Sequence, residues 1–419
     1  MFSSQLIDRA PLVPATHPLP NGNTLFYFPN ANIDLVKLDF TFEAGSAYQQ
    51  LRSQAHAANQ LFGEATSLHE ASAIAEFLDF RGIVVERMAD VCQGNISFYF
   101  LRKYAQELFP LLREMFDHPL VTPQLFEAYV GRRRQTIATN FQQTKYRARN
   151  RFYELLYGFD HPMGCYATVD DLDLLSLDAV SAFMRQHYQL PNAHIILGGC
   201  VDSELLALAD RYLAPSPYAP QPPIQLPQPH QPSYGQTDAL LMPAAVQSSL
   251  RIGSVLPFQW DHPDYAPFMV LNTILGGYFG SRLMSNIRED KGYTYGIYSQ
   301  TQIFRDSIVF FITADVAAEA TRSAVEEVFR EIALLQQQPV PDEELERVRN
   351  VMMGDFIRSI DGTFEISERY RQMVFTHVAE QFTDNYLHAI QHVTPATLQR
   401  LAQKYLTTLT TVTAGPCND

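Results

Sequence analysis

A short segment of the chain, Gln54–Gln60, carries side chains at a spacing that is used in metal chemistry. His56, Asn59 and Gln60 stand at positions i, i+3 and i+4, so a helix would place them on one face. Hydrolases with the pattern H-x-x-E-H use this geometry, in which two histidines bind zinc and the glutamate takes a proton from the zinc-bound water. Here asparagine replaces that base, and glutamine replaces the second ligand. The segment therefore has the spacing of such a motif but lacks its base and its second ligand.

The third ligand of such a site is normally a carboxylate further along the chain. No Asp or Glu occurs between Ala128 and Tyr153, where the second helix of the pair is expected. The sequence thus predicts no metal ligands and no catalytic residue in this chain. His56 taken alone has the simpler interpretation of an ordinary helix residue.

A second candidate site lies in the segment Gly276–Ser299. Ser281–Glu289 has the pattern of a short helix, which Lys291 and Gly292 would end, and an alternating strand follows it. Arg288 stands at the helix end and Tyr295 near the strand start. An arginine can hold the carbonyls of an extended peptide, and a phenol can donate to a developing oxyanion. The alternative is a solvated, charged turn.

Two further groups of residues have both a functional and a structural interpretation. His388 and His392 share a helical face that zinc could use, but they lack an acid at the base position, and a histidine at a helix end also favours the helix dipole. Seven cations without an intervening acid favour a solvated face or one that meets an acidic partner or substrate, and a nucleic-acid patch is the alternative. They are Arg132, Arg133, Arg134, Lys145, Arg147, Arg149 and Arg151.

The elements that must position these residues occur twice in the chain. The helical stripe that ends at His118 recurs 220 residues later, before Pro339, and Ser176–Tyr188 matches Thr394–Leu406 at an offset of 218. Residues 214–236 lie between the copies and hold eight of the 26 prolines, which favours a semi-rigid linker over a proline-rich ligand. The predicted organisation is an N-terminal lobe at 1–213, a linker at 214–236 and a C-terminal lobe at 237–419.

Runs of β-branched and aromatic residues between the helices indicate strands. Most of them alternate, or can be covered on one face only, which suits antiparallel sheets backed by helices. The expected strands are Leu38–Glu43, Ile83–Arg87, Ile96–Leu101, Leu250–Val255, Tyr293–Thr301 and Ser307–Ile312, and each half closes with one more, within His194–Cys200 and Thr410–Cys417. The predicted fold class is α+β, with two homologous lobes that each contain a mostly antiparallel sheet backed by helices.

Composition excludes several classes of protein. With 46% hydrophobic and 18% charged residues the chain is not disordered, and its formal charge of −14 argues against nucleic-acid binding. The most apolar stretch, Tyr265–Gly280, is shorter than the ~20 residues that a bilayer requires, so no membrane association is expected. The start of the chain has no secretory pattern, and a cytoplasmic location is expected.

Almost the whole chain resembles the pitrilysin/insulinase-like zinc peptidases, in particular their bacterial processing-peptidase-like branch. The resemblance rests on the two-lobe repeat, on GSAYQ before the His56 helix, on LLYGFDHPMG at Leu155–Gly164 and above all on SRLMSNIREDKGYTYGIYS. It implies that His56, Asn59 and Gln60 are the positions of a vestigial zinc motif, and that the lobes close in pairs around a chamber. It also implies that Arg288 and Tyr295 bind the peptide and polarise its carbonyl.

The resemblance further implies a role for a chain without the zinc motif. In this branch the active unit is often a dimer, in which one subunit holds zinc and a subunit lacking zinc supplies the Arg/Tyr pair. The expected function is that of the second, non-catalytic subunit, with zinc in its partner and none in this chain. The alternatives are a peptide-binding or structural homodimer without proteolytic activity, and a peptidase with unorthodox metal ligands such as His388 and His392.

Overall fold

A computed structural model describes residues 13–214, 233–376 and 381–416. Its contacts divide the chain into two compact units, each built around one sheet. Unit 1 comprises residues 1–136, 167–227 and 359–375, and unit 2 comprises residues 137–166, 228–358 and 376–419. The predicted linker at 214–236 lies mostly outside the described residues.

Unit 1 contains a six-stranded sheet in the order β1-β2-β8-β3-β6-β5. All neighbouring pairs are antiparallel except β2 and β8. The strands are β1 (Ala15–Pro18), β2 (Thr24–Pro29), β3 (Leu35–Phe42), β5 (Val84–Ala89), β6 (Gly94–Leu101) and β8 (His194–Gly199). Its helices are α1 (Gln54–Leu61), α2 (Ala71–Phe80), α3 (Ala105–Asp117), most of α4 (Pro123–Phe141), α6 (Leu177–His187), α7 (Ser203–Tyr212) and α11 (Thr363–Phe375). A short ladder joins β4 (Ala65–Thr66) to β7 (Pro119–Leu120).

Unit 2 repeats this topology in a five-stranded sheet with the order β11-β12-β10-β13-β9. Only β13 and β9 run parallel. The strands are β9 (Thr237–Leu241), β10 (Gln247–Leu256), β11 (Thr294–Ile303), β12 (Ile308–Ala317) and β13 (Thr410–Gly415). Its helices are α5 (Thr144–Tyr157), α8 (Tyr265–Asn272), α9 (Thr321–Gln337), α10 (Asp342–Arg358), α12 (Gln381–His392) and α13 (Pro395–Tyr405), with π-helices η7 (Thr273–Gly277) and η8 (Met284–Asp290). Sheet order and helix positions confirm the expected fold class and all eight predicted strands, with shifts at their ends.

One face of each sheet packs against helices from the same half of the sequence. In unit 1, Phe40 on β3 and Phe100 on β6 contact Phe116 and Phe109 of α3. The apolar stripe of α3 therefore covers the strands that surround it in the sequence, as its helical spacing predicts.

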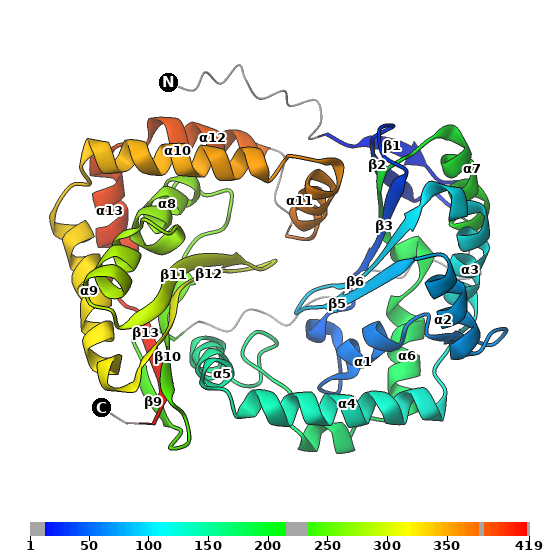
Figure 1. The fold of residues 1–419 in the computed structure, drawn as a ribbon, viewed down its shortest axis with the longest axis horizontal. Helices are drawn as coiled ribbons and strands as arrows, with labels where there is room; N and C mark the ends of the chain where they lie inside the picture. Colours follow the sequence, from blue (N-terminus) through cyan, green and yellow to red (C-terminus); the bar gives the residue numbers. More distant parts are fainter. Residues whose placement is uncertain (1–12, 215–232, 377–380, 417–419) are drawn as a thin grey trace. The chain divides into compact units, whose positions relative to one another are not determined.

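The opposite face of each sheet packs against a helix from the other half. Helix α11 lies on β2 and β8, where Ile366 packs against Phe28 and Ile196, and helix α5 lies on β10 and β13 (Figure 1). In α5, Phe152 and Leu156 pack into a buried cluster with Val412 and other residues of these strands. Each unit is thus completed by one helix that the other half of the chain contributes, and we call α5 and α11 the exchanged helices.

Candidate functional site

The residues predicted to be a vestigial zinc motif lie on α1, in the helix that their spacing predicts. The face that would hold metal is occupied by hydrogen bonds within unit 1. The Nδ1 atom of His56 lies 2.9 Å from the hydroxyl of Tyr129 on α4, and the two groups share a hydrogen bond. Asn59, fully buried, donates to the backbone oxygen of Asn95 at 3.1 Å, and Gln60 donates to the backbone oxygen of Arg87 at 3.1 Å.

The charge around His56 is positive where a zinc site would be negative. Burial, together with the cationic Arg133 on α4, lowers the pKa of His56 to about 4. A zinc ion needs anionic or neutral donors converging on it, whereas Arg133 would repel a dication. Within the described ranges, no three His, Cys, Asp or Glu side chains are grouped to hold a metal. The residues present do not fit zinc.

The shifted pKa of His56 predicts a specific pH dependence of stability. Unfolded His56 has an ordinary pKa of 6.5 and the folded residue one of about 4, so the unfolded state binds more protons between these values. The stability present above pH 6.5 should therefore decline as pH falls toward 4, by at most roughly 3 kcal/mol. Urea unfolding at pH 7 and pH 4.5 measures this loss.

The control for this prediction is a comparison of two histidine variants. His56→Gln should reduce the loss of stability between pH 7 and pH 4.5, while His388→Gln, at an exposed position, should leave it as in the wild type. An equal pH slope in the wild type and in His56→Gln would show that His56 titrates normally in the folded protein.

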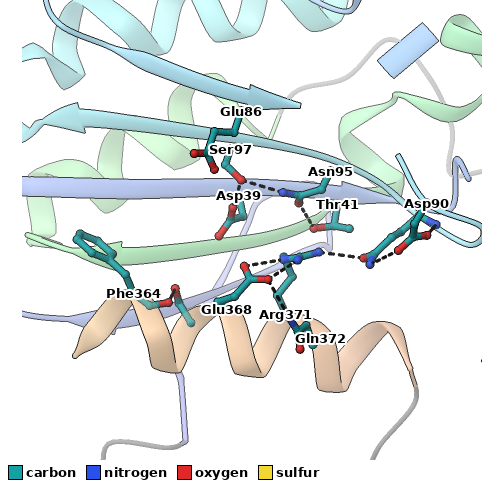
Figure 2. Close-up of polar contacts among 12 residues, drawn as sticks. Asp39, Thr41, Glu86, Asp90, Asn95, Ser97, Phe364, Glu368, Arg371 and Gln372 are labelled. Carbon is teal, nitrogen blue, oxygen red and sulfur yellow. Dashed lines mark hydrogen bonds and ion pairs between the residues drawn. The ribbon is translucent and has the colours of Figure 1, made fainter. Parts of the chain in front are cut away.

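The structure also reveals a buried polar network that sequence analysis does not predict. From Asn59 it continues through Asn95, whose side chain donates to Ser97 at 2.8 Å, and Ser97 donates to Asp39 at 2.5 Å (Figure 2). Lys37 then lies 3.1 Å from both Asp39 and Glu368 of α11. The network connects the vestigial motif to an exchanged helix.

Beside this network lies a pocket of about 360 Å³. Its wall mixes charged side chains with aromatic and apolar ones, and it is lined by Lys37, Glu86, Met88, Asn95, Ser97, Tyr99, Phe364, Glu365, Glu368 and Arg371. Asn95 and Ser97 on β6 and Lys37 on β3 come from neighbouring strands, since β3 pairs with β6. The pocket therefore lies over the sheet face that α11 partly covers (Figure 2).

Arg288 lies in unit 2 on the π-helix η8, where an α-helix was expected. Its guanidinium stacks on the ring of Phe279, 4.5 Å from the centroid, and lies 3.8 Å from Glu289. The expected helix at Ser281–Glu289 thus contains one wider turn, Met284–Asp290. Such turns recur at functional sites because they displace a side chain from the regular helical face.

Tyr295 is 92% exposed on β11, the edge strand of the second sheet. Between Thr294 and Ile297, β11 has one residue more than the segment of β12 that pairs with it, and this extra residue forms a β-bulge. The Thr294 hydroxyl stabilises the bulge, since it accepts from the Gly296 amide at 3.0 Å and donates to the Asp315 carbonyl at 2.6 Å. A bulge of this kind redirects side chains and interrupts strand pairing.

The end of η8 and the start of β11 are held together. The Tyr293 amide donates to the Ile287 carbonyl at 3.0 Å, and the Ile297 amide approaches the sulfur of Met284 at 3.4 Å. Arg288 and Tyr295 therefore flank one tethered turn, although no contact between their side chains is found in the described chain. Their role stays a prediction.

The two histidines at the end of α12 form a local contact. The rings of His388 and His392 stack at 4.3 Å, and Nδ1 of His392 lies 3.0 Å from the His388 carbonyl oxygen. The second histidine thus caps its own helix end. The structural interpretation accounts for the pair without a metal.

Comparisons with known proteins agree with this geometry. Residues 175–352 match the family described as "Peptidase M16 inactive domain". The "Uncharacterized zinc protease YmxG" of Bacillus subtilis is 21% identical over 352 residues, covering 82% of this chain and 83% of the relative. The "Non-peptidase homolog YmxG" of Helicobacter pylori is 22% identical over 241 residues, covering 57% of this chain and 55% of the relative. A crystal structure of a "peptidase M16 inactive domain from Pseudomonas fluorescens" aligns with a TM-score of 0.85 at 23% identity, covering 96% of this chain and 98% of that one.

The fold and the matches together show an α+β protein that resembles M16 peptidases. The resemblance to the pitrilysin/insulinase-like zinc peptidases is thereby confirmed, and residues 175–352 correspond to the inactive domain of that family. No helix in the described part of the chain is long and apolar enough to cross a membrane.

Proposed function

We propose that this chain is the non-catalytic, peptide-binding subunit of a heterodimeric zinc peptidase. Its partner would be a homologous chain that holds zinc, and Arg288 and Tyr295 would contact the peptide at the partner's zinc. The cofactor of the assembly would be zinc in the partner, with none in this chain.

The contrast between the two candidate sites carries this proposal. On α1, the three motif side chains are engaged in hydrogen bonds within unit 1 and face the cation Arg133. On β11, the Tyr295 side chain is almost fully exposed at a bulged strand edge, and among the described residues Arg288 has one ion partner, Glu289 at 3.8 Å. A subunit with a purely structural role would not require an arginine and an exposed tyrosine at the edge of a sheet.

Reconstitution with a zinc-bearing homologue from the same organism tests the proposal. Arg288→Ala and Tyr295→Phe should each lower the turnover of a fluorogenic peptide by about 10² to 10³, the range measured for removal of one oxyanion donor. Tyr298→Phe on the same strand and Arg322→Ala on α9 are matched controls, since both side chains are exposed. Equal turnover in Arg288→Ala, Tyr295→Phe and these controls would refute the assigned role.

Metal analysis of the isolated chain separates the alternatives. Zinc that survives dialysis at one ion per chain would favour the peptidase with unorthodox ligands. A homodimer that binds peptide and gains no activity with any zinc-bearing homologue would favour the structural alternative. We expect no retained zinc and activity only in the mixed assembly.

A further inference from the structure

Arg251 is a buried cation that has no ion-pair partner among the described residues. It lies on β10, on the sheet face that α5 covers, and is only 7% exposed. Its Nε atom has no hydrogen-bond partner, and the guanidinium forms no ion pair with any residue that the structure describes. The guanidinium makes a cation–π contact with Phe311, in which the guanidinium carbon lies 4.5 Å from the centre of the ring.

Arg251 nevertheless stays charged at neutral pH. Burial, opposed in part by Tyr153 and strengthened by the cationic Arg149 of α5, lowers its pKa to about 10. A buried charge without a counter-ion is strongly unfavourable, and stacking on one aromatic ring offsets only a part of that cost. Asp315 attracts it from a distance, but that carboxylate accepts from the Ser249 hydroxyl instead.

The corresponding position of unit 1 shows how such a charge is normally neutralised. In the strand ladders, Asp39 lies opposite Ile196 of β8, and Arg251 lies opposite Val412 of β13. Ile196 and Val412 each stand three residues before the glycine that ends their strand. Asp39 is therefore the counterpart of Arg251. Lys37 neutralises Asp39, and the exchanged helix α11 brings Glu368 and Arg371 to the same network (Figure 2).

Helix α5 brings no acid to Arg251. Its only acidic residue, Glu154, lies 2.8 Å from Arg151. The first two turns instead carry Lys145, Arg147 and Arg149, and Gln143 at the N-cap makes no capping hydrogen bond with its side chain. This end of α5 and the guanidinium beneath it thus form a positive site within a chain of net charge −14.

We propose that Arg251 and Arg149 form a binding site for a carboxylate group. A carboxylate matches the fork of a guanidinium and supplies negative charge, which the described residues do not bring to Arg251 as an ion pair. Arg149 is exposed and marks the side from which the group would enter. That a bound peptide provides the carboxylate rests on the proposed function, whereas the site itself does not.

Binding of labelled peptides measures this site directly. The probes are a neutral hexapeptide with a free C-terminal carboxylate, its C-terminal amide, and that amide with one internal glutamate. We expect the wild-type chain to bind one or both carboxylate probes about 10- to 100-fold more tightly than the neutral amide. The preferred probe distinguishes a peptide C-terminus from an acidic side chain.

Three variants test which residues cause the preference for carboxylate probes. Arg251→Met, of similar volume and without charge, and Arg149→Gln should abolish it, while Arg322→Met at an exposed position of α9 should preserve it. Arg251→Met should also melt at or above the wild-type temperature, because an unpaired buried charge has been removed. A carboxylate preference that survives in Arg251→Met would overturn the site.

Succinate, a small dicarboxylate, distinguishes a failure of this site from a failure of the proposed function. If succinate raises the melting temperature of the wild type but not of Arg251→Met while no peptide binds, the site stands and the peptide-binding role fails. If peptides bind without any carboxylate preference, the role stands and the site is wrong.

Discussion

Replacing Arg371 by methionine should lower the free energy of unfolding by about 1.5–3 kcal/mol, the range for hydrogen bonds to a charged group, because the Glu368 side chain is 35% exposed. The Arg371 side chain is only 2% exposed. Its guanidinium donates to both oxygens of the Glu368 carboxylate, at 3.0 Å through Nε, and to the side-chain oxygen of Gln93 at 3.0 Å. Without it, Lys37 is the one cation that still faces both Asp39 and Glu368 among the described residues, so the half-buried carboxylate of Glu368 loses its main counter-ion.

Urea unfolding at pH 7 measures this loss, with Arg322→Met as the control, because Arg322 forms only an exposed pair on α9. The pH dependence supplies a second readout. Burial acts to raise the pKa of Glu368, but Arg371 and Lys37 outweigh it and lower that pKa to about 2. The stabilisation is present above pH 4.5 and is lost as pH falls toward 2, and Arg371→Met should weaken this dependence. A change below about 1 kcal/mol at pH 7 would mean that solvent reaches the network.

A fragment of residues 13–214 should not form a stable unit 1 by itself, whereas the same fragment with residues 359–376 appended through a flexible linker should. Without α11, Phe28 and Ile196 lose the cover of Ile366, and Lys37 loses Glu368. Each buried aliphatic or aromatic side chain contributes about 1.5–3 kcal/mol, so the loss is a large part of a typical domain stability of about 5–15 kcal/mol.

Dispersion of amide signals and the cooperativity of urea unfolding distinguish the two fragments. The control appends the same segment with Arg371→Met and Ile366→Ala, which keeps its length and helical spacing but removes its two main contacts. Equal cooperativity in all three fragments would show that residues 1–213 fold as the independent lobe that the linker at 214–236 predicts. That division stays a prediction, since most of the linker is outside the described residues.

Local patterns were sufficient to predict most elements of the fold. The stripe ending at His118 becomes α3, the N-caps Ser176 and Thr394 begin α6 and α13 with side-chain hydrogen bonds, and alternation marks β11. Periodicity shows which face of an element is buried but not what buries it. The packing of α5 and α11 on sheets of the other half was therefore not predictable from their sequences.

The candidate sites, like the fold, were predictable from the sequence only in part. Helical spacing placed His56, Asn59 and Gln60 on one face, and the lost ligands followed from residue type. Their contacts with Tyr129, Asn95 and Arg87 depend on tertiary pairing across 73, 36 and 27 positions, which no local pattern encodes. The π-turn and the β-bulge around Arg288 and Tyr295 were missed because each shifts the register by one residue without a distinctive sequence.

The exchanged helices give the chain the connectivity of a domain-swapped dimer whose two copies have been joined end to end. In such a dimer each copy donates a segment to the other, and α5 and α11 each pack on the sheet that the other half of the sequence forms. Fusion keeps the two donors at a fixed ratio and within one molecule. It also frees the two copies to diverge, so that one sheet could retain a neutralised charge at Asp39 while its counterpart acquired the unpaired Arg251.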